Sequence, residues 1–212
     1  MGCPPPADAA TLVVNTTADV STGVGCASGC SLREALATAA SGDEIVFASP
    51  LFDSPQMILL TPLGRGGLGG LEIATNVTIN GPGAHLLTVG RPSLAHLDVI
   101  PTEDRLAPIF DISTDGVVVL RGMTITGGRL PAGVGGGIRI HASGATVTVE
   151  ACHITGNRST AGGGIRADDD LILIDSTVSN NVASASAGGI TATFATITII
   201  NSTISGNRSV PD

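Results

Sequence analysis

The chain has no tryptophan, no tyrosine and no lysine among its 212 residues. Proteins usually hold sugars against aromatic platforms, so the absence of tryptophan and tyrosine argues against a carbohydrate-active site of the common kind. Without lysine, all ten basic residues are arginine, set against 18 acidic residues for a net charge of -8. Phosphate binding needs a basic face, so this acidic excess predicts that nucleic acid is not a partner.

Long apolar runs are also missing, and we therefore expect no membrane span. The first residues, Met1 to Pro6, have neither the basic segment nor the apolar segment of an export signal. We nevertheless expect an extracellular or cell-surface location, with the targeting segment removed from this sequence, because the features described below are typical of exported proteins.

Cysteine is scarce, with four residues, and Cys26 and Cys30 lie four positions apart in one short loop. This spacing predicts a disulfide that stabilises the loop, which implies an oxidising compartment. A zinc site is the alternative, but it needs about four ligands, and no second Cys or His pair has metal spacing. We therefore expect no metal or cofactor, and we interpret Cys3 and Cys152 as free thiols.

Glycine, by contrast, is abundant, with 29 residues, and it marks an internal repeat in the C-terminal part of the chain. The glycine-rich turns recur at intervals of 27 and 25 residues and are Gly135-Gly136-Gly137-Ile138, Gly162-Gly163-Gly164-Ile165 and Ala187-Gly188-Gly189-Ile190. The alternating apolar pairs that follow these turns are Val147 and Val149, Leu171 and Leu173, and Ile197 and Ile199. Apolar residues at every second position predict strands and exclude a helical repeat.

The repeat predicts an all-β fold, a right-handed single-stranded parallel β-helix, with one coil per repeat. Alternate apolar residues would point into a narrow core and stack on their equivalents one coil away, at about 4.8 Å. The glycines would serve the bends, where a positive φ or a close backbone approach is needed.

Each coil ends in a similar corner, which contains Asn157, Asn181 or Asn207. We predict that these three side chains stack as an amide ladder between coils. Asn157-Arg158-Ser159 and Asn207-Arg208-Ser209 also match the N-glycosylation sequon, but the inward ladder is the favoured interpretation.

Cys152 and His153 precede the first of these corners, and we infer their orientation from their alignment with the other coils. Cys152 aligns with Ser176 and Ser202, so we expect a small buried side chain in a stack, and His153 aligns with Thr177 and Thr203, so we expect it to face outward.

The chain is predicted to form one unit in three parts: a Pro-rich leader (1–10), an N-terminal cap (11–60) and β-helix coils (61–212). The cap contains Ser31-Leu32-Arg33-Glu34, a capping box that predicts a short helix over 31–40, covering the open edge of the first coil. Strand-like runs at 71–79, 86–89 and 109–112 surround a loop insertion near 91–108, and long loops on repeat scaffolds often carry binding sites. The charged residues of that loop are His96, Asp98, Glu103, Asp104 and Arg105. They could form a site, but we favour the interpretation that they belong to a polar insertion.

The segment Cys30-Ser31-Leu32-Arg33-Glu34-Ala35 resembles the signature of the CSLREA domain, an N-terminal module of large bacterial surface and secreted proteins that leads into β-helix repeats. The coils are similar to the repeats of chlamydial polymorphic outer membrane proteins, with Gly137 or Gly164 where those carry Ala. In the corners, Ile154, Val178 and Ile204 stand where those repeats carry Phe. The resemblance implies an exported adhesin-like or structural surface protein, and neither family supplies catalytic residues.

Many β-helices are polysaccharide lyases or hydrolases, which need paired carboxylates, or an acidic calcium cluster with an arginine base. The best candidate here is Asp168-Asp169-Asp170, with Arg139 and Arg166 at equivalent positions in adjacent coils. The neighbouring coils replace the acidic run with other residues, so a solvated turn is favoured. A polysaccharide-active enzyme of the pectate-lyase-like type is kept as the alternative function.

A third hypothesis is a flat threonine array that binds ice or a mineral, suggested by Thr146-Val147-Thr148 and Thr196-Ile197-Thr198. Asp170 and Ile172 interrupt that array, so this hypothesis is not favoured. We expect a non-catalytic extracellular scaffold with an unknown protein or polysaccharide partner. Its last coil would be open to further repeats or to end-to-end self-association.

Overall fold

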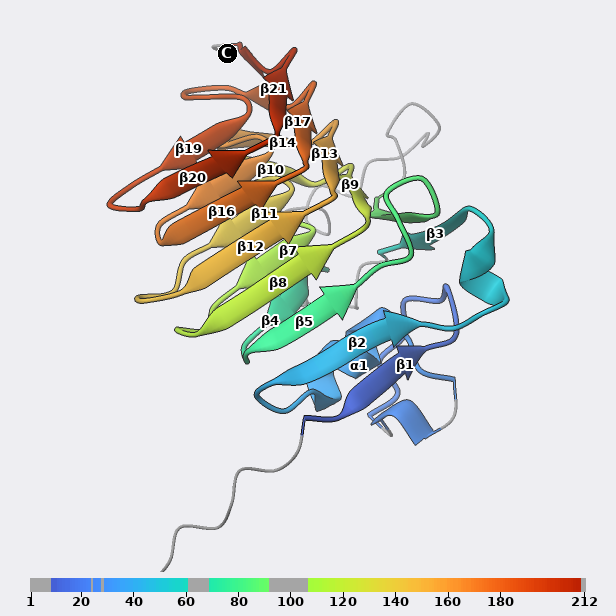
Figure 1. The fold of residues 1–212 in the computed structure, drawn as a ribbon. Coiled ribbons are helices and arrows are strands. Elements are labelled where there is room, and N and C mark those ends of the chain that lie inside the picture. Colours follow the sequence, from blue (N-terminus) through green and yellow to red (C-terminus); the bar gives the residue numbers. More distant parts are fainter. Residues whose placement is uncertain (1–8, 24, 28, 61–68, 92–106, 211–212) are drawn as a thin grey trace, which may run out of the picture.

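The computed structural model describes residues 9–23, 25–27, 29–60, 69–91 and 107–210. Within these ranges the strands form four parallel sheets, here named A to D, that surround one elongated apolar core (Figure 1). In the last coils the chain runs from sheet A to sheet B, then to sheet D and sheet C, before it returns to sheet A. The predicted all-β parallel β-helix is thereby confirmed.

The strands of each sheet come from successive coils, which stack in chain order. Sheet A contains β1 (Thr11–Val14), β2 (Asp43–Phe47), β5 (Val77–Asn80), β8 (Val117–Arg121), β12 (Thr146–Glu150), β16 (Asp170–Ile174) and β20 (Ile197–Ile200). Sheet B contains β3 (Gln56–Leu59), β6 (Leu87–Gly90), β9 (Thr124–Thr126), β13 (His153–Thr155), β17 (Thr177–Ser179) and β21 (Thr203–Ser205). Sheet C contains β4 (Leu71–Ile73), β7 (Phe110–Ile112), β11 (Ile138–Ile140), β15 (Ile165–Ala167) and β19 (Ile190–Ala192). Sheet D contains β10 (Arg129–Val134), β14 (Arg158–Ala161), β18 (Val182–Ala183) and β22 (Arg208–Ser209).

The apolar rows follow from the register between coils. Val147 pairs with Leu171, and Leu171 pairs with Ile197, so three equivalent side chains stack in one row as the sequence predicted. Val147 and Leu171 are fully buried, whereas their outward neighbours Thr148 and Ile172 are half-buried. Period-two alternation therefore sorts each strand into a core face and an outer face.

The bends depend on two backbone features. After sheet A, successive coils place Gly122, Ala151, Asp175 and Asn201 in the left-handed region, with φ between 46° and 61°. At the glycine-rich turns the coils approach each other closely, because a Cβ built on Gly137 would lie 2.6 Å from the carbonyl oxygen of Gly164. Such a side chain would clash with the neighbouring coil, which explains the repeated glycines.

Two expectations about the strands need correction. The run 71–79 is two strands, β4 and β5, which belong to different sheets because the chain turns between them. Sheet D was not predicted, since β18 and β22 are two-residue strands without a periodic pattern.

The N-terminal end of the stack is covered by helix α1 (Leu32–Thr38), between the 3-10 turns η1 (Gly25–Ala27) and η2 (Leu51–Asp53). Ser31 caps the helix by accepting a hydrogen bond from the Glu34 N–H at 3.1 Å. Hydrogen bonds from the side chain and backbone of Thr22 lower the pKa of Glu34. Arg33 pairs with Asp19 and donates to the carbonyl oxygen of Gly70 at 2.6 Å, which ties the helix to the first coil of sheet C. None of the described helices is long and apolar enough to cross a membrane.

The stacking row makes a direct stability prediction. Leu171→Asp would bury an unpaired carboxylate between Val147 and Ile197, at a cost of about 3 to 5 kcal/mol. The matched control, Ile172→Asp, points outward from the same strand and should cost about 1 kcal/mol. Chemical denaturation followed by circular dichroism measures both values, and equal effects of the two substitutions would contradict the register.

Candidate functional site

The outer face of sheet C carries a row of charged residues. In register from coil to coil, this row is Glu72, Asp111, Arg139, Arg166 and Thr191. Each member lies on the middle residue of a three-residue strand whose flanking side chains point into the core. Successive members are therefore about 4.8 Å apart along the stack.

Arg139 and Asp111 form the centre of this row. The Nε and Nη2 atoms of Arg139 donate to the two carboxylate oxygens of Asp111 at 2.8 and 2.6 Å, a bidentate pair. His141 Nε2 lies 3.0 Å from Asp111 Oδ1. The hydrogen bond to Asp111 raises the pKa of Arg139, so this guanidinium stays protonated and cannot act as a base near neutral pH.

The three predicted acids do not converge on one point. Asp168 accepts from Arg166 Nε at 2.6 Å, Asp169 accepts from the Gly144 N–H at 2.9 Å, and Asp170 accepts from the Thr196 N–H at 2.9 Å. The structure thus places Asp168 beside the charged row of sheet C, whereas Asp169 and Asp170 bind the backbone of the preceding and the following coil. Within the described ranges, no group of three or more His, Cys, Asp or Glu side chains is arranged to hold a metal ion.

Asp111, a member of this row, and His141, which contacts Asp111, were missed by the sequence analysis. Asp111 lies 28 residues before Arg139, close to the 27 residues between Arg139 and Arg166, but no glycine-rich turn precedes it, so the repeat was not extended to its coil. Its position in a strand with the pattern Phe-Asp-Ile, like Ile-Arg-Ile in β11, was the available signal.

The three asparagines lie in one inward row at the corner between sheets B and D. Asn157 Nδ2 donates to Asn181 Oδ1, and Asn181 Nδ2 donates to Asn207 Oδ1, each at 3.0 Å. The same oxygens accept the backbone N–H groups of Asn157 and Asn181 at 3.0 Å. Asn157 and Asn181 are buried, so their amides are occupied by the ladder, and Asn157 does not offer its nitrogen to a glycan. The row begins at Gly128, whose N–H donates to Asn157 Oδ1 at 2.9 Å.

A second inward row runs through Cys152, Ser176 and Ser202. The Cys152 N–H donates to Ser176 Oγ, and the Ser176 N–H donates to Ser202 Oγ, both at 3.0 Å. Burial raises the pKa of the Cys152 thiol to about 12, so it stays protonated at neutral pH and is a poor nucleophile. His153 lies on the outer face of sheet B, with Nε2 2.9 Å from Ser179 Oγ in the next coil.

The remaining predicted residues lie near the N-terminal cap or beyond the described ranges. Cys26 and Cys30 form a disulfide, and Cys30 is buried immediately before the helix cap Ser31. Cys3 and the loop residues His96, Asp98, Glu103, Asp104 and Arg105 lie outside the residues that the structure describes.

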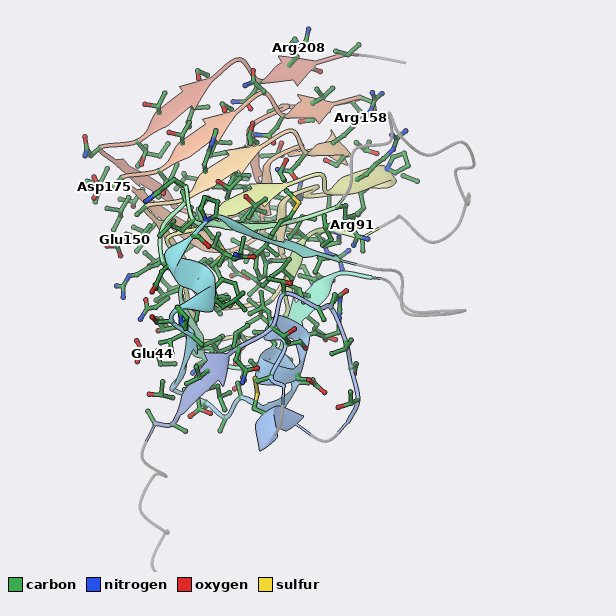
Figure 2. All side chains as sticks on the ribbon, turned by 90° about the vertical axis from the view of Figure 1, so that its right-hand side faces the viewer. Glu44, Arg91, Glu150, Arg158, Asp175 and Arg208 are labelled. Carbon is green, nitrogen blue, oxygen red and sulfur yellow. A yellow bond between two sulfur atoms is a disulfide. The ribbon has the colours of Figure 1, made fainter. Side chains whose placement is uncertain are left out.

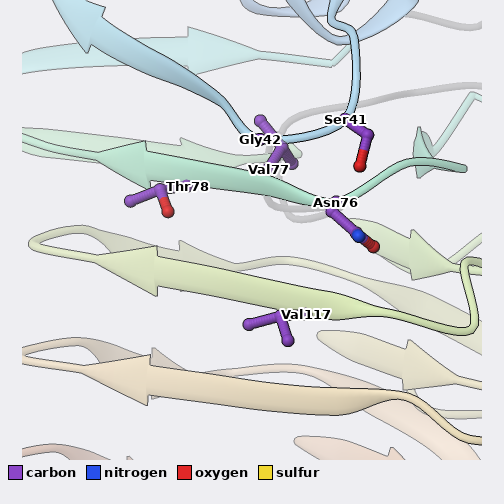
Figure 3. Close-up of a pocket in the computed structure, with 6 residues that line it drawn as sticks. All are labelled: Ser41, Gly42, Asn76, Val77, Thr78 and Val117. Atoms are coloured by element: carbon purple, nitrogen blue, oxygen red, sulfur yellow. The ribbon is translucent and has the colours of Figure 1, made fainter. Parts of the chain in front are cut away.

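A shallow hollow of about 260 Å³ lies between the start of sheet A and the turns that precede it (Figure 3). Its lining consists of Ser41, Gly42, Asn76, Val77, Thr78 and Val117. None of these side chains is ionisable, so the hollow offers hydroxyl and amide contacts but no acid or base.

Residues 74–211 match the model of the family described as the right handed beta helix region. This match spans more than half of the chain, so the chain belongs to that family, and its coils are those of a right-handed parallel β-helix. No curated protein and no solved structure shows a match to the chain.

The asparagine ladder predicts a graded loss of stability. Asn181→Ala would leave the buried Asn157 N–H without a partner and would remove one hydrogen bond from the Ile154 carbonyl, at a cost of about 3 kcal/mol. Asn207→Ala, at the half-buried end of the ladder, should cost about 1 kcal/mol. Urea unfolding measures both, and an Asn181→Ala variant as stable as the parent would mean that the ladder does not stabilise the stack.

Proposed function

We propose that the chain is a non-catalytic, extracellular β-helical scaffold, an adhesin-like module of a bacterial surface or secreted protein. The observation that carries this proposal is the use of the predicted acidic site within the fold. Asp168, Asp169 and Asp170 bind a side chain and two backbone groups of the stack, and Arg139 is held by Asp111. Groups engaged in this way stabilise coils.

Export is supported by the N-terminal cap. The disulfide between Cys26 and Cys30 suits an oxidising compartment. The CSLREA-like segment supplies a buried cysteine, the helix cap Ser31 and the Arg33 contacts to the first coil, as a module that starts a β-helix would need. This segment is the basis for assigning the chain to surface or secreted proteins.

The last coil supplies a surface for assembly. Ile199 and Ile204 are equivalent to Leu173 and Val178 of the coil below, which are fully buried in the core. In the last coil, however, Ile199 and Ile204 are 47% and 46% exposed. The apolar rows and the open strand edges of β19 to β22 fit one kind of neighbour, another β-coil in the same register. A further coil of the same polypeptide or a coil of another copy would fill this surface.

The backbone of the last coil shows which groups face such a neighbour. Arg208 and Val210 donate their N–H groups to the coil below, so the N–H of Ser209 between them points to the open edge. Thr193 likewise donates to Ala167, so the Ala192 N–H points to the open edge of sheet C.

We predict concentration-dependent end-to-end association of the chain in sedimentation velocity. Ala192→Pro combined with Ser209→Pro would remove two open donors without breaking a bond inside the stack, and it should suppress this association. Ala192→Ser with Ser209→Ala is the matched control and should associate like the parent. A monomer at every concentration would contradict coil-edge assembly.

A second candidate, a polysaccharide-active enzyme, is favoured by one observation, the contact between the Asp111 carboxylate and the His141 ring on an outer face of the helix. A carboxylate that orients an imidazole is a common part of acid–base sites.

The scaffold proposal predicts that the chain releases no reducing or unsaturated ends from pectate or alginate, with or without calcium. Turnover that disappears in Asp111→Asn or Asp168→Asn, and persists in Asp170→Asn, would overturn the scaffold and establish the enzyme.

A further inference from the structure

The charged row of sheet C is ordered by sign along the stack. Its four charged members follow one another in register from coil to coil and are Glu72, Asp111, Arg139 and Arg166. We call these four residues the sheet C quartet. The two anions lie toward the N-terminal end of the stack and the two cations toward its C-terminal end. Glu72 is exposed and the other three are half-buried, so all four reach the surface.

The hydrogen bonds inside the chain leave part of the quartet available. Within the described ranges, Arg139 uses two of the five N–H groups of a guanidinium, both on Asp111. No cation among the described residues pairs with Glu72, which accepts one long hydrogen bond, from Ser113 Oγ at 3.5 Å. The quartet therefore offers a carboxylate without a cation at one end and guanidinium donors in its second half.

On two other sides of the stack, charges of one sign are grouped. Figure 2 shows Glu44, Glu150 and Asp175 on one side and Arg158 and Arg208 on the other. Two copies that met through either of these sides would bring like charges together, which opposes association. The sheet C quartet differs from both sides because it carries both signs, separated along the axis of the stack.

We infer that the sheet C quartet is a contact between two copies of the chain, which lie side by side with their stacks antiparallel. A two-fold axis between the positions of Asp111 and Arg139 places Glu72 opposite Arg166 of the second copy, and Asp111 opposite its Arg139. Every contact between the quartets then joins opposite charges. In a parallel arrangement each residue would lie opposite itself, and all four contacts would be repulsive. A two-fold contact of this kind is the commonest form of self-complementary surface.

The spacing of the row reserves one of these attractions for a second copy. Glu72 and Arg166 are three coils apart, about 14 Å within one copy, which is too far for an ion pair. Their attraction is therefore available only between copies. Four ion pairs that remain partly exposed contribute little each, so we expect a weak dimer whose affinity falls as salt rises.

The side-by-side contact adds a second mode of association to the end-to-end mode of the proposed scaffold. The inference rests on that proposed function in one respect, because it assigns the outer face of sheet C to a contact and not to chemistry. The coil edge is a different surface, whose apolar rows are not weakened by salt. The two modes can therefore be measured separately.

The test uses the full chain with Ala192→Pro and Ser209→Pro as the background, which suppresses end-to-end association. Sedimentation at low salt should show a monomer–dimer equilibrium that weakens at least tenfold at high salt. Glu72→Arg and Arg166→Glu should each weaken the dimer at least tenfold. An equimolar mixture of these two variants should form a dimer with one copy of each, because both contacts between positions 72 and 166 then join an arginine to a glutamate.

Glu44→Arg makes the same change of charge on sheet A, and this control should dimerise like the parent. Circular dichroism and melting establish that each variant is folded. Glu72 is exposed and has no ion pair to lose among the described residues, so Glu72→Arg tests the contact even if Arg166→Glu does not fold.

Three outcomes overturn the inference: no dimer at low salt, a mixture of the two folded variants that stays monomeric, or a dimer that Glu72→Arg and Glu44→Arg weaken equally. Cleavage of a polysaccharide would overturn the scaffold function and leave the mixing result unaffected. Persistence of long end-to-end species in the proline background would contradict coil-edge assembly, whereas only the side-by-side contact responds to the charges at positions 72 and 166. The failures of the two proposals are thus distinguishable.

Discussion

The in-register pairing of one coil with the next is the constraint on which the rest of the structure depends. Each strand hydrogen-bonds to the same strand one coil away, so every side chain lies beside the residue at its equivalent position. An apolar position must therefore be compatible with itself, as Val147, Leu171 and Ile197 are. The same rule applies to polar and charged positions, where self-compatibility is harder to achieve.

The polar rows show two ways of meeting that requirement. Asparagine satisfies itself, because its amide donates to one neighbour and accepts from the other, and the buried ladder uses both functions. Arginine cannot donate to arginine, so on sheet C the stacked pair is compensated by Asp111 and Asp168.

The sequence predicted the features that recur at regular spacing and missed those that do not. The register of Leu171 and the asparagine row followed from glycine-rich turns 25 to 27 residues apart. Sheet D was missed because β10 and β14 have no alternating apolar pattern and β18 and β22 have only two residues each. Asp111 was not linked to Arg139, although the two lie 28 residues apart, because no glycine-rich turn marks the coil of Asp111. Contacts between coils become visible in a sequence only when both coils carry the residues that mark the repeat.

The open edge of the last coil has a consequence for how such proteins change in length. Removing β20 to β22 would expose the backbone of β16 to β18, which presents the same kinds of groups, including the next amide of the ladder. The free-energy cost of an end is then nearly the same wherever the stack stops, whereas each added coil contributes its own pairing energy. Whole coils can therefore be gained or lost in evolution without a new design for the ends, and the number of coils is free to follow the reach that a surface requires.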